Sequence, residues 1–124
     1  MRAVGRPGGG TLGRVTITLT TIGRRTGKAR RATLYAFEDG ERLVVVGSKG
    51  GASRDPAWAH NLRANPRAVL GTERRERSVH ATEVDGPDRD RLWALVCEAF
   101  PLYATYQRRT TRLIPLFVLD PVDG

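Results

Sequence analysis

Hydrophobic and polar residues alternate along the first part of the chain. Val15, Ile17 and Leu19 are apolar, and threonines stand between them. A period of two with many β-branched residues is typical of a half-buried strand, so the pattern predicts a strand here. Further strands are expected at about residues 31–38, 42–47, 67–71, 75–84 and 114–119. Asp39 and Gly40 separate the second and third strands, and this pair favours a hairpin turn.

Two stretches carry the marks of helices. Asp55 is expected to cap a short helix with Pro56 at its first position, and this helix should end near Ala64. A second helix starts at Pro87, where apolar residues recur at steps of three and four, and Pro101 interrupts it before one further helical turn. Strands outnumber helices and do not alternate with them. The pattern therefore favours an antiparallel sheet or barrel with helices attached, rather than a doubly wound α/β fold.

The length of 124 residues is that of one domain. Residues 1–13 include five glycines, and we expect them to form a flexible leader before a single domain at 14–124. No apolar stretch approaches the ~20 residues that span a bilayer, and the start lacks the apolar core of a signal peptide. Cys97 is the only cysteine, which favours a cytoplasmic protein. With two histidines it is too little for a closed zinc site, so no metal is expected.

The charge of the chain is unevenly distributed. Lysine and arginine number 21 against 13 acidic residues, a net charge of +8. No acidic residue occurs before Glu38, and basic residues crowd between Arg24 and Arg31. Such a cluster is typical of an anion site for a phosphate, a polycarboxylate or a nucleic acid backbone, with a solvated basic loop as the alternative. The first 34 residues hold no aromatic side chain, which disfavours a platform for single-stranded nucleic acid.

The segment from Gly47 to Gly51 reads Gly-Ser-Lys-Gly-Gly and superficially resembles a phosphate loop. It lacks the Walker A spacing. Glycines after a strand can let backbone N–H groups approach a ligand closely, although an ordinary turn is the simpler interpretation. Ser48, Asp55 and His60 do not indicate a hydrolase triad, because no Gly-x-Ser-x-Gly elbow surrounds the serine.

Five motifs, taken in order, resemble those of the deazaflavin-dependent nitroreductase family of actinobacteria. They are Leu19 to Gly27 with Arg30, Leu34-Tyr35, Gly47 to Gly51, Pro56 to Trp58 with Asn61 to Pro66, and Tyr103 to Gln107. The resemblance extends over about residues 19–121, and it is the order and spacing of the motifs that make it specific. It implies a mainly β fold, a split β-barrel of antiparallel strands with a few short helices, of the FMN-binding split-barrel type.

The resemblance also implies a cofactor, coenzyme F420, which is a deazaflavin with a phosphate and a polyglutamate tail. FMN is the less favoured alternative. The cofactor-binding residues that it implies are Arg24, Arg25, Thr26, Arg30, Arg31, Ala32, Thr33, Leu34, Tyr35, Gly47, Ser48, Lys49, Ala57, Trp58, Ala59, His60, Asn61 and Tyr103. Because guanidinium groups bind phosphate through paired hydrogen bonds, the basic cluster agrees with this assignment.

The implied activity is hydride transfer from the reduced deazaflavin to a small activated acceptor, such as a nitroaromatic, a quinone or an enone. Ser48, Tyr35 and Tyr103 are the implied catalytic residues, and Ser48 or Tyr103 would stabilise negative charge on the acceptor oxygen. The alternatives are an F420-binding carrier without turnover and, less favoured, a basic nucleic-acid-binding module. No nucleic acid partner is expected, and a homodimer is expected only by analogy with the barrel class.

Overall fold

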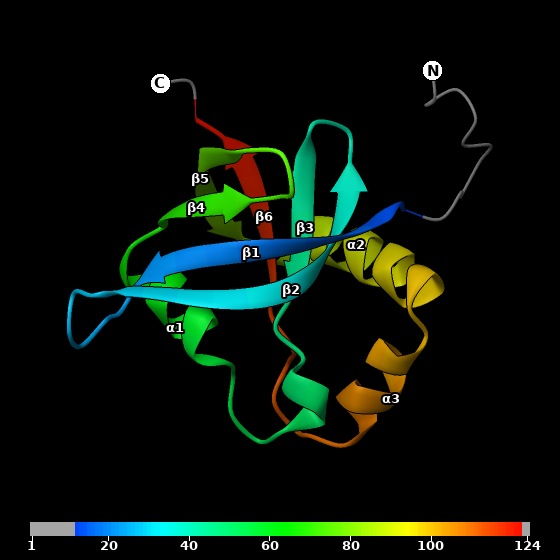
Figure 1. Cartoon of the computed structure of the whole chain (residues 1–124). Helices are drawn as coiled ribbons and strands as arrows, with labels where there is room; N and C mark the ends of the chain where they lie inside the picture. The colour runs from blue at the N-terminus through cyan, green and yellow to red at the C-terminus, as the bar shows by residue number, and fades with distance from the viewer. Residues whose placement is uncertain (1–11, 123–124) are drawn as a thin grey trace.

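The structure is a computed structural model that describes residues 12–122. Six antiparallel strands close into a barrel in the order β1-β2-β3-β6-β5-β4 (Figure 1). The strands are β1 (Arg14–Ile22), β2 (Ala29–Asp39), β3 (Arg42–Val46), β4 (Arg67–Gly71), β5 (Glu76–Glu83) and β6 (Leu116–Pro121). The mainly β barrel expected from the alternating pattern is confirmed, as is the hairpin turn between β2 and β3, where Gly40 has a φ of 66°.

Three short helices are attached to the barrel. They are α1 (Ala57–Ala64), α2 (Gly86–Ala99) and α3 (Leu102–Arg108), and a 3₁₀ turn at Lys49–Gly51 precedes α1. In Figure 1, α1 lies below the left end of β1 and β2, whereas α2 and α3 lie at the right of the barrel. The turn Lys49–Gly51 contacts α3, so segments that are about fifty residues apart in sequence meet below β2.

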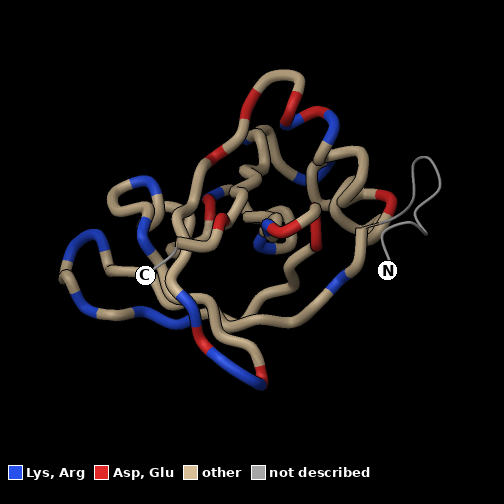
Figure 2. Tube along the Cα trace, turned by 90° about the horizontal axis from the view of Figure 1, so that it is seen from above, with Lys and Arg blue, Asp and Glu red and all other residues tan. Residues whose placement is uncertain are grey.

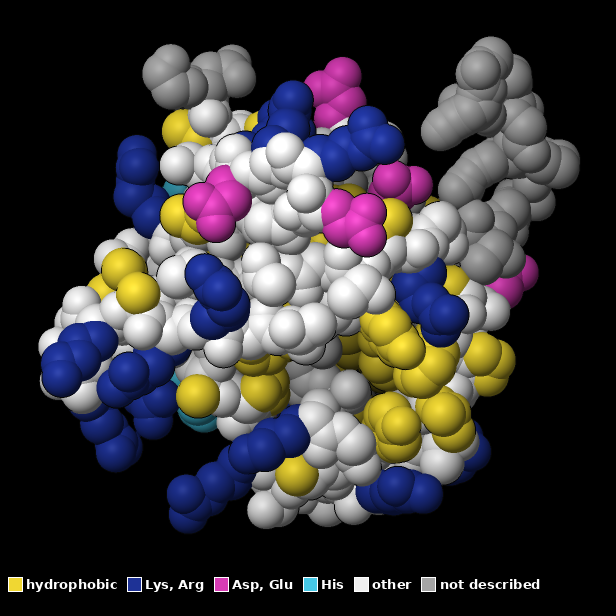
Figure 3. All heavy atoms as spheres, in the orientation of Figure 1, with side chains coloured by type: hydrophobic (Ala, Val, Ile, Leu, Met, Phe, Trp, Pro, Cys, Tyr) yellow, Lys and Arg dark blue, Asp and Glu magenta, His cyan; other side chains and the backbone are white. Residues whose placement is uncertain are grey.

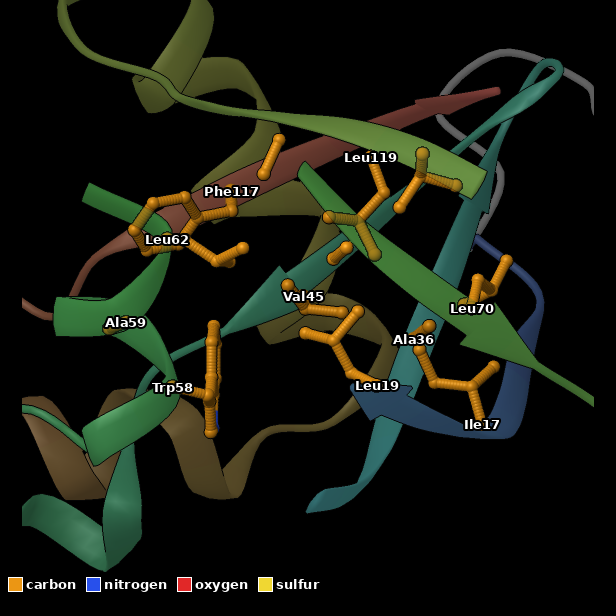
Figure 4. Close-up of a cluster of buried hydrophobic side chains, with 13 residues drawn as sticks. Ile17, Leu19, Ala36, Val45, Trp58, Ala59, Leu62, Leu70, Phe117 and Leu119 are labelled. Carbon is orange, nitrogen blue, oxygen red and sulfur yellow. The ribbon is translucent and has the colours of Figure 1, made fainter. Parts of the chain in front are cut away.

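The barrel is filled by one face of each strand. Ile17 and Leu19 of β1 are at most 2% exposed, whereas Thr18 between them is only partly buried. Trp58 of α1 packs against the ring of Phe117 on β6, with centroids 5.8 Å apart, and closes one end of this core (Figure 4). Each such fully buried side chain stabilises the fold by about 1.5–3 kcal/mol. A second cluster, around Phe37, packs the outside of the barrel against α2 and α3.

Strand β2 extends well beyond the end of β3, its partner on one side. It pairs with β1 from Ala29 to Phe37, but with β3 only from Ala36 to Asp39. Among the described strands, the edge of β2 at residues 29–35 therefore has no partner. Helix α1 and the turn Lys49–Gly51 lie opposite this edge (Figure 1). An unpaired edge offers backbone N–H and C=O groups to a ligand.

Two local expectations were wrong. Asp55 does not cap α1; Pro56 occupies the cap position, and the Asp55 carboxylate binds Arg63 and Arg112 at 2.8 and 2.6 Å instead. The last strand begins two residues later than expected, because the N–H of Ile114 donates to the side chain of Gln107 rather than to a strand. The residues just before β6 are buried and apolar like the strand itself, so hydrophobicity alone did not show where the strand begins.

The predicted leader at residues 1–13 lies outside the described residues except for its last two. Leu12 is 6% exposed and belongs to the cluster under α2 and α3. The carbonyl of Gly13 accepts a hydrogen bond from the N–H of Glu38 at 2.8 Å. The chain is therefore already packed on the barrel two residues before β1 begins.

Candidate functional site

A groove runs along the unpaired edge of β2 and consists of two adjoining pockets. The first, the arginine pocket, has a volume of about 430 Å³, and the second, the tyrosine pocket, about 370 Å³. Both are lined by Trp58, and consecutive residues of β2 continue from one into the other. Figure 3 shows a hollow below β2, with basic side chains toward its left end and hydrophobic ones at its right.

The arginine pocket is formed by the loop between β1 and β2 and by the start of α1. The predicted residues that line it are Arg24, Arg25, Thr26, Arg30, Arg31, Ala32, Ala57, Trp58 and Asn61. No acidic side chain is among its lining residues. Figure 2 shows the basic residues of this loop and of the start of β2 gathered at one end of the molecule. Four guanidinium groups without acidic neighbours make a strongly anion-attracting surface.

The loop that carries these arginines is closed by its own backbone. Gly27 adopts a left-handed conformation with φ of 72°, which glycine reaches without strain. Its N–H donates to the carbonyl of Gly23 at 2.8 Å, and the N–H of Gly23 donates to Lys28 at 2.7 Å. The hydroxyl of Thr26 accepts the N–H of Lys28 at 3.2 Å. The two glycines of the motif therefore set the turn that presents the arginines.

Asn61 connects this loop to α1. Its side-chain oxygen accepts the N–H of Arg24 at 3.0 Å, and its side-chain nitrogen donates to the hydroxyl of Thr21, also at 3.0 Å. The side chain is 4% exposed. A buried amide with both ends bonded is a rigid connection, because breaking either bond leaves a polar group unsatisfied. Asn61 lines the pocket and also fixes where Arg24 stands.

The tyrosine pocket is walled by aromatic rings. The predicted residues that line it are Thr33, Leu34, Tyr35, Ser48, Lys49, Trp58 and Tyr103. Phe100 joins Tyr35 to Tyr103, with ring centroids 5.7 and 4.8 Å from theirs, and Tyr106 lies 6.3 Å beyond Tyr103. All three pairs are in edge-to-face geometry, which aromatic rings favour. The pocket therefore suits a flat, mostly apolar molecule.

Two phenols of this pocket differ in their surroundings. Tyr35 is 42% exposed, and the guanidinium of Arg14 stands 4.5 Å from its ring centroid. Tyr103 is 5% exposed, and burial raises the pKa of its hydroxyl above the ordinary value, with a smaller contribution from Tyr35. Tyr103 thus keeps its proton over the whole physiological pH range and can donate a hydrogen bond.

Gly47, Ala59 and His60, which were also predicted to bind the cofactor, line neither pocket. Ala59 is fully buried in the barrel core, and Gly47 is buried against Pro115. His60 is partly buried near the arginine pocket. Its pKa is lowered, first by burial and then by the positive charges of Arg24 and Arg63. The imidazole is therefore neutral at neutral pH and reports the local positive potential.

The structure also brings to the groove several residues that were not among the predicted site residues. Further lining residues are Thr21, Gly23, Val46, Gly50, Pro56, Phe100 and Tyr106. Arg14 also reaches the site from the other end of β1, by its contact with Tyr35. The heptapeptide after Pro101 carried a usable signal, because Tyr103 and Tyr106 are three residues apart on one helix and so share a face. No comparable signal marks Arg14.

The residues present fit coenzyme F420. The arginine pocket offers guanidinium groups to a phosphate and to carboxylates, and the tyrosine pocket offers aromatic walls and Trp58 to a flat ring. No acidic side chain lines either pocket, so nothing in the groove repels a polyanion. Fold and site together define a split-barrel protein with a groove for a large ligand that is flat at one end and anionic at the other.

The comparison with known proteins places the chain more closely. Residues 1–121 match the F420H(2)-dependent quinone reductase family, and the chain belongs to it. An F420H(2)-dependent quinone reductase of Mycobacterium tuberculosis is 40% identical over 106 residues, which are 83% of this chain and 71% of the relative. A putative F420H(2)-dependent quinone reductase of the same organism is 31% identical, covering 86% and 89%.

Solved structures agree with the family. One described as an F420-H2 dependent reductase, FDR-A, superposes with a TM-score of 0.76 at 36% identity, covering 85% of this chain and 93% of that one. Another, described as a domain-swapped dimer, has a TM-score of 0.77 at 36% identity, covering 85% and 79%. The expected deazaflavin-dependent reductase class, its split barrel and its cofactor F420 are thereby confirmed. The names of these relatives specify quinones or no acceptor, not nitroaromatics.

Proposed function

We propose that this chain reduces quinones at the expense of F420H2, in the cytoplasm. The observation that carries the proposal is the groove along β2, which is guanidinium-lined at one end and phenol-lined at the other. The names of the relatives that match over most of the chain support a quinone as the acceptor. None of the helices in the described part of the chain is long and apolar enough to cross a membrane.

The two ends of the groove would divide the binding of the cofactor. Arg24, Arg25 and Arg30 would hold its phosphate and carboxylates, because paired charged hydrogen bonds are the strong ones. Trp58 and Leu34 would hold its flat ring beside the unpaired edge of β2. When bound and reduced, the deazaflavin supplies the hydride.

The chain's own residues would act on the acceptor at the tyrosine pocket. The Ser48 hydroxyl and the Lys49 ammonium line it and would stabilise negative charge that develops on a quinone oxygen. Tyr103 holds a proton at its phenolic oxygen and would donate a hydrogen bond to that oxygen. The wall of Tyr35, Phe100 and Tyr106 would keep water away from the reacting atoms.

The first experiment is a titration of the protein with oxidised F420 and, separately, with FMN. Trp58 lines both pockets, so its fluorescence should report binding, and a Trp93→Phe background removes the only other tryptophan. Oxidation of F420H2 is then followed with menadione as the quinone. We expect F420-selective binding and menadione-dependent oxidation. Binding without oxidation by any quinone would favour the carrier, and no binding of F420 would overturn the proposal.

The arginine pocket is tested by variants with a matched control. Arg24→Ala and Arg25→Ala should each weaken F420 binding about 10- to 100-fold, because a charged hydrogen bond contributes about 1.5–3 kcal/mol. Arg74→Ala removes an equal charge from the β4–β5 loop, away from the groove, and should leave the affinity unchanged. If all three variants lose the same affinity, only the net charge matters and the phosphate assignment is wrong.

A homodimer is proposed with less support. The solved neighbour described as a domain-swapped dimer is 36% identical to this chain. Light scattering coupled to size exclusion decides between a mass of about one chain of 13.7 kDa and a mass of two.

A further inference from the structure

Arg112 lies between α3 and β6, and its side chain is only 14% exposed. Its guanidinium donates to the carbonyls of Gly47, Ser48 and Ala52 at 3.1, 2.8 and 2.8 Å. It also donates to the Asp55 carboxylate at 2.6 Å. One guanidinium therefore connects both ends of residues 47–52, and Asp55 after them, to a point about sixty residues further along the chain.

The segment held in this way has an unusual backbone. Lys49 has a φ of 43°, and it is the only non-glycine residue at positive φ in the described range. Such a conformation costs about 1–3 kcal/mol and persists only where the surroundings enforce it. The 3₁₀ turn adds two bonds of its own, from the N–H of Gly51 to Ser48 and from that of Ala52 to Lys49. Without Arg112 the turn would be held against the strain by these two bonds and by its contacts with α3.

Asp55 connects Arg112 to the start of α1. Its carboxylate accepts Arg112 with one oxygen and Arg63 of α1 with the other, at 2.6 and 2.8 Å. The next residue, Pro56, lines the tyrosine pocket, and α1 begins immediately after it. One guanidinium thus connects the turn, the start of α1 and the approach to β6.

Arg112 itself lines neither pocket, whereas Ser48 and Lys49 line the tyrosine pocket. We propose that Arg112 is a positioning residue for the acceptor end of the groove. By fixing three carbonyls of residues 47–52, it holds the Ser48 hydroxyl and the Lys49 ammonium where they meet the acceptor. The inference rests on the proposed function for its kinetic consequence, but its structural part concerns the free protein.

The test compares Arg112→Ala with Arg63→Ala. Arg63 binds the other oxygen of Asp55, and also Glu83, but no carbonyl of residues 47–52, so its loss is a control for the removal of an ion pair at Asp55 without the carbonyl contacts. Hydrogen exchange of the peptide that covers residues 47–53 is measured without ligand. We expect faster exchange of the Gly51 and Ala52 amides in Arg112→Ala and no change in Arg63→Ala, because only the first loses the contacts that order the turn.

Steady-state kinetics supply the second readout. For Arg112→Ala we expect kcat/KM for menadione to fall about 100-fold, since a misplacement of about 1 Å in a catalytic group costs about that much. Titration with F420 should change by less than about threefold, because the arginine pocket is untouched. Arg63→Ala should leave both values near those of the wild type. Arg112→Lys keeps the charge for Asp55 but cannot reach three carbonyls, so it should restore stability more than kcat/KM.

Each result decides something. Unchanged exchange at residues 47–53 in Arg112→Ala overturns the proposal, and so does faster exchange with unchanged kcat/KM. If the alanine variant does not fold, the lysine variant carries the same comparison. A wild type that orders the turn through Arg112 but oxidises no F420H2 with any quinone would remove the proposed function while leaving the role of Arg112 in the turn.

Discussion

The side-chain oxygen of Asn61 accepts the backbone N–H of Arg24 at 3.0 Å, across 37 residues of sequence. The nitrogen of the same amide donates to Thr21 at the end of β1. Helix α1, which also supplies Trp58 to the groove, is therefore fastened to the arginine loop at the point where the loop begins. A cofactor that spans both pockets meets a single rigid wall rather than two independent segments.

Two replacements of Asn61 test separately the charge of the arginine pocket and the position of Arg24. Asn61→Asp keeps an acceptor for Arg24 and can accept the hydroxyl of Thr21, but it adds a negative charge to an acid-free pocket. We expect F420 to bind about tenfold more weakly, by about 1.4 kcal/mol, because the new charge repels the anion. Asn61→Ala should instead lower the free energy of unfolding by about 1–3 kcal/mol, because buried groups lose partners. Equal F420 affinity in wild type and Asn61→Asp would mean that the anion binds elsewhere.

Removing the hydroxyl of Tyr103 should slow turnover without weakening the cofactor. Because burial raises the pKa of this phenol, it stays protonated as pH rises through the usual range of tyrosine, and activity should show no loss from its titration between pH 6 and about 10. Tyr103→Phe should lower kcat about 100-fold if the phenol donates a hydrogen bond to the acceptor oxygen. Tyr106→Phe, whose ring lies 6.3 Å away in the same pocket, is the control. Similar kcat values in both variants would reduce Tyr103 to a packing residue.

Two adjacent glycines give a matched pair of substitutions. Gly50 and Gly51 have φ of 63° and 84°, so alanine at either position costs about 1–2 kcal/mol in backbone strain. A methyl group on Gly50 meets nothing within 4 Å, whereas one on Gly51 would lie 2.7 Å from the carbonyl of Tyr106 and 2.9 Å from Arg109. Gly51→Ala should therefore destabilise the protein by about 1–3 kcal/mol more than Gly50→Ala, as read from urea unfolding. Equal losses of stability in the two variants would show that α3 moves to accommodate the methyl group without a cost in free energy.

The pKa of His60 should respond to an anion in the arginine pocket. In the free protein it is lowered by burial and by Arg24, Arg63 and Arg25, and Asp55 opposes these effects in part. Neutralising the guanidinium charges raises the pKa, so binding takes up protons and tightens as pH falls through the titration range of His60. Proton NMR of His60 in a His80→Gln background, with and without F420, measures the shift. An unchanged pKa would place the anion away from Arg24.

Much of the fold followed from the sequence because its signals are local. Alternating residues marked β1, the pair Asp39-Gly40 marked the hairpin, and Pro101 marked the break between α2 and α3. The errors arose where a distant partner decided the outcome. Aspartate is a residue type that is typical of an N-cap, but the Asp55 carboxylate is bound by two arginines, one of them 57 residues away. No residue near Asp55 in the sequence indicates that Arg112 binds its carboxylate.

The residues of the site show the same difference between local signals and contacts that only the fold creates. The arginine loop and the tyrosine pair could be found because each lies in one short segment. Residues whose role depends on packing could not, since Arg14 reaches Tyr35 only through the pairing of β1 with β2. Ala59 sits beside Trp58 in sequence, yet a helix turns consecutive residues about 100° apart and sends it into the core.

The edge of β2 where we propose that the cofactor binds is also a hazard when nothing is bound. A bare strand edge is a template on which another chain can add a strand, and proteins commonly protect such edges with charge. Arg30 and Arg31 stand on this edge, within a positively charged end of the molecule. Before the cofactor arrives, mutual repulsion between molecules would keep these edges apart. Arginines that would attract an anionic ligand would thereby also protect the protein against self-association and aggregation.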